Sequence, residues 1–367
     1  MCAKMQRLIN KTSPIPRYYQ LGQILKKKIT SGKFPPGSKF FSERRLMQEY
    51  KLSLTTVRQT LSELVKEGFL YREHGSGTYV RGFEGTERAA QVKDIGLICS
   101  SLSNPLFSEV VEKIESFAKK RGYHTILSIT NGTLSDIKKS ICSLKERGVP
   151  AIIAGPIYHG REELAYLSSL GEGNLRIVIF GCSEPTEVDY VTINRAKGAY
   201  EAVNYLVKLG HKNIAHAGIS KSSCIWSKLS GFKKGLLDNG IKFNNSMLIE
   251  SMGGEVNGYK AMKDVLEKRE KPTAILAHDD LAAMGMMKAV KEAGLKVPDD
   301  FSIIGFDGIE ASAYTEVPLT TVSQPKTDLA EKLVEVLEQK FRGKNIHNGI
   351  VLEPKLVIRD SCARRRD

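Results

Sequence analysis

The stretch FSERRLMQEYKLSLTTVRQTLSELVKEGFLYREHGSGTYV, residues 41–80, decides how the N-terminal part of the chain folds. Ser42 and Ser53 each stand before a run in which apolar residues recur at helical spacing, and serine is a favoured N-cap. Two short helices joined by a tight turn predict a helix-turn-helix. The β-prone residues on both sides of the glycine-rich segment 74–77 predict a hairpin, or wing, after the second helix.

A further helix is expected upstream, at residues 17–31, because four apolar side chains share one helical face there and glycine and proline follow. Charge is concentrated in this part of the chain. Residues 1–82 carry sixteen Lys and Arg against five Asp and Glu, which is +11 of the formal charge of +14. A positive field at one end favours an anionic partner such as nucleic acid.

Composition excludes several classes of protein. The six cysteines have no C-x-x-C spacing and the seven histidines do not cluster, so neither a disulfide framework nor a metal site is expected. No stretch resembles a secretory signal or a membrane span, which predicts a cytoplasmic protein that does not bind membranes. The motifs G-x-x-x-x-G-K-[ST], G-x-S-x-G and H-E-x-x-H are absent, so we expect no catalytic residues, no cofactor and no enzymatic activity.

The sequence pattern changes after residue 92. Residues 83–92 lack apolar periodicity and are expected to form a linker. Short apolar runs then alternate with amphipathic helical stretches, which predicts an α/β fold with parallel sheets covered by helices on both faces. The expected strands are 95–99, 125–129, 151–154, 177–180, 213–217, 274–277 and 302–305.

The length of this second part predicts two doubly wound lobes over residues 93–360, because it exceeds what one core usually holds. A ligand is then expected between the lobes, at the carboxyl ends of the strands. Residues 361–367 are expected to form a disordered tail.

Four landmarks in the N-terminal part resemble the winged helix-turn-helix of GntR-type regulators: FSERRL at 41–46, SLTTVR at 53–58, LVKEGFL at 64–70 and GSGTYV at 75–80. The resemblance implies a DNA-binding domain over residues 1–82. The residues expected at DNA are Arg44, Ser53, Thr55, Thr56, Arg58, His74, Gly75 and Gly77. A guanidinium can read guanine or hold a phosphate, hydroxyls and helix N-termini hold phosphates, and glycine lets the wing approach closely.

Two features limit what the resemblance implies about the DNA sequence. Arg44 and Arg45 also fit a solvated helix face, which is the interpretation preferred for Arg45. Leu54 stands where the family commonly has arginine. Because leucine cannot read guanine edges, the DNA sequence bound by relatives does not transfer to this chain.

Motifs in the second part are similar, in order and spacing, to the effector domain of LacI/GalR-type regulators, which is itself similar to periplasmic sugar-binding proteins. They are SLSNPLF at 101–107, LVKLGHKNIA at 206–215, DDLAAMG at 279–285, VPDDFSIIGFD at 297–307 and PLTTV at 318–322. The resemblance implies a two-lobed domain that binds a small effector, by analogy a sugar.

Sugars require carboxylates and amides for their hydroxyls and an aromatic face for the apolar side of the ring. The candidate effector-binding residues are Phe107, Tyr158, Asn194, Trp226, Lys228, Asp279 and Asp307. Ligand contact is preferred for Asp307, whereas Asp279 also fits a helix N-cap and Trp226 also fits simple packing. Lys228 stands where the family often has arginine, so the identity of the sugar does not transfer.

Together the two resemblances imply a transcription repressor that binds a double-stranded DNA operator as a homodimer and is released by a small sugar. This combination of domains is that of arabinose-type repressors, which makes a pentose the nearest analogy. Two alternatives stay open: a periplasmic-type solute-binding protein, and a regulator that senses a nucleoside or another non-sugar metabolite.

Overall fold

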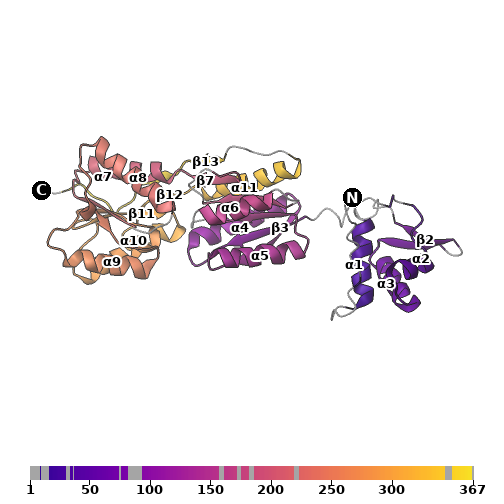
Figure 1. Ribbon diagram of the computed structural model, residues 1–367. Helices are drawn as coiled ribbons and strands as arrows, with labels where there is room; N and C mark the ends of the chain where they lie inside the picture. The colour runs from indigo at the N-terminus through magenta and orange to yellow at the C-terminus, as the bar shows by residue number, and fades with distance from the viewer. Residues whose placement is uncertain are drawn as a thin grey trace. The chain divides into compact units, whose positions relative to one another are not determined.

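Internal contacts divide the chain into two units, Met1–Gln91 and Val92–Asp367, in the computed structural model (Figure 1). The structure describes residues 9, 16–29, 34–35, 37–73, 76–81, 93–156, 161–171, 175–181, 186–218, 223–343 and 349–365. None of the described helices is long and apolar enough to cross a membrane.

The N-terminal unit is the predicted winged helix-turn-helix. Its elements are α1 (Arg17–Lys28), α2 (Glu43–Tyr50), α3 (Leu54–Lys66) and the antiparallel hairpin of β1 (Leu70–Glu73) and β2 (Gly77–Val80). Ser42 and Ser53 cap α2 and α3, each accepting a backbone hydrogen bond of 3.3 Å. All five elements contribute to one apolar core, whose fully buried members include Leu21, Leu25, Leu46, Val57, Leu64 and Leu70.

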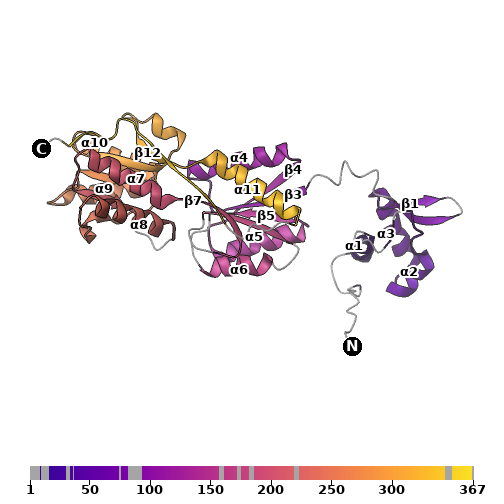
Figure 2. The ribbon, with the colours of Figure 1, turned by 90° about the horizontal axis from the view of Figure 1, so that it is seen from above.

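The C-terminal unit contains two six-stranded sheets, which confirms the predicted doubly wound fold. The sheet of the first lobe is parallel in the order β13-β7-β6-β5-β3-β4. Its strands are β3 (Lys93–Cys99), β4 (Tyr123–Ile129), β5 (Ala151–Ala154), β6 (Arg176–Phe180), β7 (Asp189–Ile193) and β13 (Ile350–Leu352). Its helices are α4 (Pro105–Lys120) and α11 (Lys326–Phe341) on one face, and α5 (Leu134–Glu146) and α6 (Arg161–Gly171) on the other (Figure 2).

The second lobe repeats this plan with the order β14-β12-β11-β10-β8-β9. Its strands are β8 (Ile214–Ala217), β9 (Leu248–Ile249), β10 (Ala274–Leu276), β11 (Ser302–Asp307), β12 (Thr320–Ser323) and the antiparallel β14 (Lys355–Val357). Its helices are α7 (Arg195–Lys208) and α8 (Ser223–Asp238) on one face, and α9 (Glu255–Glu267) and α10 (Asp280–Glu292) on the other. Two short 3-10 helices, η3 (Asn245–Met247) and η4 (Glu310–Ala313), lie in loops.

The chain crosses between the lobes three times. It passes from β7 to α7 at Asn194, from β12 to α11 at residues 324–325, and from β13 to β14 at residues 353–354. The apolar pattern of the sequence did not predict the strands on either side of these crossings, because they are short and two of them hold threonine where an apolar residue would mark a strand. The crossings form the hinge of the C-terminal unit.

The C-terminal residues differ from the expected disordered tail, because residues 361–365 are joined to the second sheet. Ser361 is fully buried. Its Oγ donates to the Ile303 carbonyl at 2.6 Å and accepts from the Thr320 amide at 2.9 Å, while the Ala363 amide donates to Ser302 Oγ at 3.1 Å. The segment therefore covers the amino ends of β11 and β12, away from the expected ligand site.

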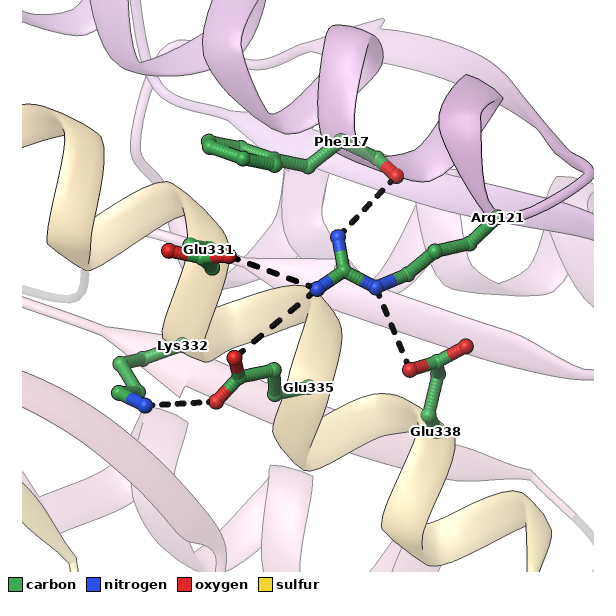
Figure 3. A network of polar contacts seen from close by, with 6 residues as sticks. All are labelled: Phe117, Arg121, Glu331, Lys332, Glu335 and Glu338. Atoms are coloured by element: carbon green, nitrogen blue, oxygen red, sulfur yellow. Dashed lines mark hydrogen bonds and ion pairs between the residues drawn. The ribbon is translucent and has the colours of Figure 1, made fainter.

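Arg121, at the end of α4, joins this helix to α11 through three glutamates (Figure 3). Its guanidinium nitrogens lie 3.7 Å from Glu331, 3.9 Å from Glu335 and 3.3 Å from Glu338, and it donates to the Phe117 carbonyl at 3.4 Å. Because α11 enters the first lobe from a crossing, this network fixes the helix to α4 within that lobe.

We expect Arg121→Ala to lower the free energy of unfolding by about 1 kcal/mol, because three carboxylates lose the cation that they share. Urea unfolding followed by circular dichroism measures the change, and added salt should reduce it by screening the carboxylates. Lys139→Ala is the control, since it removes only an exposed pair with Asp136, 3.5 Å long, worth no more than about 0.5 kcal/mol. Equal losses in the two variants would contradict this role for Arg121.

Candidate functional site

The recognition helix of the N-terminal unit, α3, presents polar side chains at its exposed start. Thr55 and Arg58 are exposed, and the Oγ atoms of Ser53 and Thr56 lie 2.8 Å apart, so these two hydroxyls complete the cap of α3. Free backbone N–H groups at such a helix start attract phosphate. Leu54, which replaces the family's arginine, is also exposed and therefore lies on the same surface rather than in the core.

A groove of about 530 Å³ runs between α2, α3 and the strand β2. Its lining includes Lys39, Arg44, Leu54, Arg58 and Gly77, so the structure brings together three of the predicted DNA-binding residues. Gly77 has a φ of 134°, a conformation that favours glycine. The other predicted wing residues, at positions 74 and 75, lie outside the described residues.

Two arginines near this groove have different surroundings. Arg58 Nε donates to Glu43 Oε2 at 3.0 Å, which ties α3 to α2 while the side chain stays 61% exposed. Arg45 instead stacks over the Phe41 ring, with 4.3 Å between its guanidinium carbon and the ring centre. This is a cation–π contact, and the interpretation of Arg45 as part of a solvated helix face stays a prediction.

In the C-terminal unit, the carboxyl ends of the two sheets meet at Asp307. Strand order reverses between β3 and β5 in the first lobe and between β8 and β10 in the second, and ligands of open α/β sheets bind at such points. Asn104, in the loop after β3, donates from Nδ2 to Asp307 Oδ2 at 3.2 Å. A residue of one lobe thus contacts the predicted ligand-binding carboxylate of the other.

Asp307 is held in an uncommon conformation by its neighbours. It is 4% exposed, its φ is 125°, and its Oδ1 accepts a hydrogen bond of 2.6 Å from Gln324 Nε2 at the lobe crossing. Burial raises the pKa of Asp307 to about 7, against the opposing effect of the Lys228 ammonium. Backbone strain at a buried carboxylate is typical of binding sites.

The adjacent carboxylates Asp279 and Asp280 serve the structure around Asp307. Asp279 is the N-cap of α10, accepting from the Ala282 amide at 2.7 Å, so the cap alternative left open by the sequence is the one observed. Asp280 is fully buried and accepts from the Ile309 amide at 2.8 Å and from Thr321 Oγ1 at 2.5 Å. Burial raises the pKa of Asp280 to about 6. Asp280 thereby holds the loop that follows Asp307.

The other predicted effector residues are only partly brought together. Lys228 is buried on α8, where its Nζ donates to the His278 carbonyl at 2.6 Å and lies 4.1 Å from the centre of the Phe306 ring. Asn194 lies in the hinge, where it caps α7 and donates to Glu353 Oε1 at 3.2 Å. Phe107 is half-buried against the core of the first lobe. Tyr158 and the side chain of Trp226 lie outside the described residues.

Sequence reasoning missed three residues around Asp307. Asn104 and Gln324 donate to its carboxylate, and Lys326 donates to the Gly308 carbonyl at 2.7 Å while pairing with Glu109 at 2.6 Å. Asn104 lies in the SLSNPLF motif and follows a predicted strand, so the sequence contained a pattern that could have identified it as a site residue. Gln324 and Lys326 follow β12, and this strand was not predicted.

Comparisons with known protein families agree with this division of the chain. Residues 17–80 match the model of bacterial regulatory proteins of the gntR family, and residues 203–362 match a periplasmic binding protein-like domain. Among solved structures, a dimeric Lac repressor is similar with a TM-score of 0.70 and 26% identity, over 74% of this chain and 100% of that one. A LacI family regulator from Enterococcus faecium with bound ribose has a TM-score of 0.65 and 26% identity, over 75% of this chain and 100% of that one.

Curated relatives extend the similarity over the whole chain. The arabinose metabolism transcriptional repressor of Geobacillus stearothermophilus is 30% identical over 96% of this chain and 99% of its own. The repressor PurR of Photobacterium profundum is 33% identical, but over 73% of this chain and 81% of its own. The chain therefore belongs to the family of GntR-type transcriptional repressors that carry a periplasmic-binding-protein-like effector domain.

Proposed function

We propose that this repressor binds a DNA operator through its N-terminal unit and leaves it when a small sugar binds beside Asp307. The hydrogen bond between Asn104 and Asp307 carries the proposal, because it joins the lobes at the residue that a sugar would contact. Sugar hydroxyls that bind the carboxylate must replace the Asn104 and Gln324 amides or add to them. Either change shifts the balance between lobe arrangements.

Operator binding rests on the exposed polar start of α3 and on the basic charge around it. We infer that Arg58 and Arg44 contact bases or phosphates, that Thr55 contacts the DNA, and that Ser53 and Thr56 present the helix start to a phosphate. His74, Gly75 and Gly77 of the wing are proposed to approach the minor groove, as their resemblance to GntR-type domains implies. The DNA-binding domain is proposed to span residues 1–82 and its linker residues 83–92.

Transmission to the DNA-binding unit is proposed to use the first lobe. The linker precedes β3, and Asn104 lies in the loop that follows this strand, so the bond to Asp307 lies beyond the carboxyl end of the strand that follows the linker. The ion pair of Lys197 with Glu353, 3.1 Å long, spans two of the three crossings. A sugar that changes lobe closure would therefore act on the lobe to which the DNA-binding unit is attached.

A homodimer is proposed as the active form, because two DNA-binding units read a two-fold operator far better than one. The edge strand β4 supports this, since Leu127 is 42% and Ile129 57% exposed there. Exposed apolar side chains on an unpaired edge favour association. The similar Lac repressor structure is itself described as dimeric.

A pentose is the proposed effector, because one full-length relative is named for arabinose metabolism and one similar structure contains ribose. We infer a binding protein located in the cytoplasm rather than an enzyme, since relatives of this architecture are repressors. A nucleoside or another non-sugar metabolite is the second candidate, because the similarity to PurR repressors, which covers 73% of this chain, is not to proteins named for a sugar.

Arg58→Ala should weaken operator binding about 10- to 100-fold, because an arginine contact to a base is worth about 1–3 kcal/mol. Fluorescence anisotropy measures this on an operator selected in vitro from random duplexes, at fixed salt concentration. Arg45→Ala is the matched control and should change the affinity less than about threefold, since Arg45 stacks on Phe41. Equal losses in the two variants would contradict the assignment of Arg58.

Sugar affinity should rise with pH up to about 7 and then level off, because sugar hydroxyls donate to the ionised form of Asp307, whose pKa is raised to about 7 by burial. Lys228, Asp279 and Asp280 are the other charged groups that influence this carboxyl group. Calorimetric titration of the whole protein with pentoses measures how the affinity depends on pH. The titrations cover about pH 5.5 to about pH 8.5, a range that brackets that pKa. Asp307→Asn should remove it. A dependence that survives in this variant would assign the titrating group elsewhere.

A further inference from the structure

Two histidines of the second lobe flank the place where its strand order reverses. β9 pairs with one side of β8 and β10 with the other, so the carboxyl ends of β8 and β10 border the crevice in which ligands bind. His216 lies on β8, and His278 stands two residues beyond β10. Neither was a candidate from the sequence.

Each ring has one buried nitrogen without a hydrogen-bond partner among the residues that the structure describes: Nε2 of His216 and Nδ1 of His278. Both nitrogens lie next to the position that a Cβ atom would occupy if residue 218 were not a glycine. A Cβ at this glycine would stand 3.6 Å from His216 Nε2 and 3.2 Å from His278 Nδ1. A buried nitrogen left unpaired costs about 1–3 kcal/mol, so two that face one spot indicate a polar group bound there.

The surroundings of His216 fix which of its nitrogens carries the proton. Its Nδ1 lies 3.2 Å from the Leu276 carbonyl oxygen, which can only accept, so Nδ1 is protonated. Burial lowers the pKa of His216 to about 4, so the ring is neutral at physiological pH. Its Nε2 therefore offers a lone pair and requires a donor.

His278 is also neutral and belongs to the same site as the predicted effector residues. Burial, followed by the nearby Lys228 ammonium, holds the pKa of His278 well below its ordinary value. The same ammonium donates to the His278 carbonyl at 2.6 Å and lowers the pKa of Asp307. His278 Nδ1 can thus donate one proton beside the acceptor on His216.

A hydroxyl group fits this pair, because it can donate to His216 Nε2 and accept from the Nδ1–H of His278 at the same time. An ionised phosphate or carboxylate group offers only acceptors and would face the lone pair of His216. The pair therefore selects by hydrogen-bond type.

We propose that His216 and His278 together bind one hydroxyl of a polyhydroxylated effector and so exclude an ionised phosphate or carboxylate group at that position. This specificity rests on the proposed function, because the effector is taken to bind between the lobes.

Calorimetric titration of the full chain tests the proposal with free aldopentoses, their monodeoxy analogues, their 5-phosphates and the matching aldonic acids. His216→Phe keeps a ring against Phe232, whose centre is 5.4 Å away, but removes the acceptor. We expect this variant to bind the tightest-binding free pentose at least about tenfold more weakly than the unmodified protein does. Its affinity for the one monodeoxy analogue that lacks the recognised hydroxyl should be unchanged. His124→Gln, at an exposed histidine on β4, is the control and should change neither.

The outcomes separate this proposal from the proposed function. Suppose that a pentose binds the protein and causes it to leave the operator. If His216→Phe then weakens the binding of every analogue by the same factor, only the histidine proposal is overturned. Tighter binding of an analogue that carries an ionised phosphate or carboxylate in place of the recognised hydroxyl would overturn it as well. If no pentose binds the unmodified protein, both proposals fail.

Nitrogen-15 NMR of the histidine rings gives a second reading that does not depend on a variant. We expect His216 to show the Nδ1–H form from pH 6 to 8, a range well above its pKa of about 4, and its Nε2 resonance to shift when the pentose saturates the protein. A proton on Nε2, or a resonance that the bound pentose leaves unchanged, would overturn the proposal.

Discussion

The hydrogen bonds of the buried Asp307 carboxylate join the two lobes of the C-terminal unit to a lobe crossing, and the arrangement of the proposed site depends on them. A carboxylate out of water is costly unless donors surround it, and here the donors are Asn104 from the first lobe and Gln324 from a lobe crossing. Asp280 anchors the loop that follows, and Lys326 binds the next carbonyl, that of Gly308. Hydrogen bonds therefore join the proposed site to the lobe crossing at Gln324, which supports the proposal that a ligand at Asp307 acts on the hinge.

This arrangement supports the proposal that a sugar bound in the C-terminal unit acts on DNA binding by the N-terminal unit. The three crossings are short, and two of them are joined by Asn194 and Lys197, both of which contact Glu353. α11 leaves the hinge and is fixed to α4 by Arg121. Arg121 thus holds α4 and α11 of the first lobe together, and the linker precedes β3 of that lobe. If the lobes have two arrangements of similar free energy, a small change at Asp307 is enough to favour one arrangement over the other.

Local sequence signals predicted local structure well and long-range contacts poorly. Ser42 and Ser53 were predicted as caps because a cap depends on the next three residues, and Asp307 was identified because it ends a clearly apolar strand. The Asn104 contact joins residues 203 positions apart, and no local pattern encodes it. His216 lies inside an apolar strand, where a histidine alone does not indicate whether its nitrogens are paired. The hinge strands are too short to give a periodic signal.

The most direct test of the account is release of the operator by a pentose in the Asp307→Asn variant of the full chain. Fluorescence anisotropy would follow a labelled operator while the sugar is added. We expect the variant to bind the operator as tightly as the unmodified protein, because the DNA-binding unit is intact, but not to be released by sugar concentrations that release the unmodified protein. Release of the variant at the same sugar concentration would contradict the central role of this carboxylate.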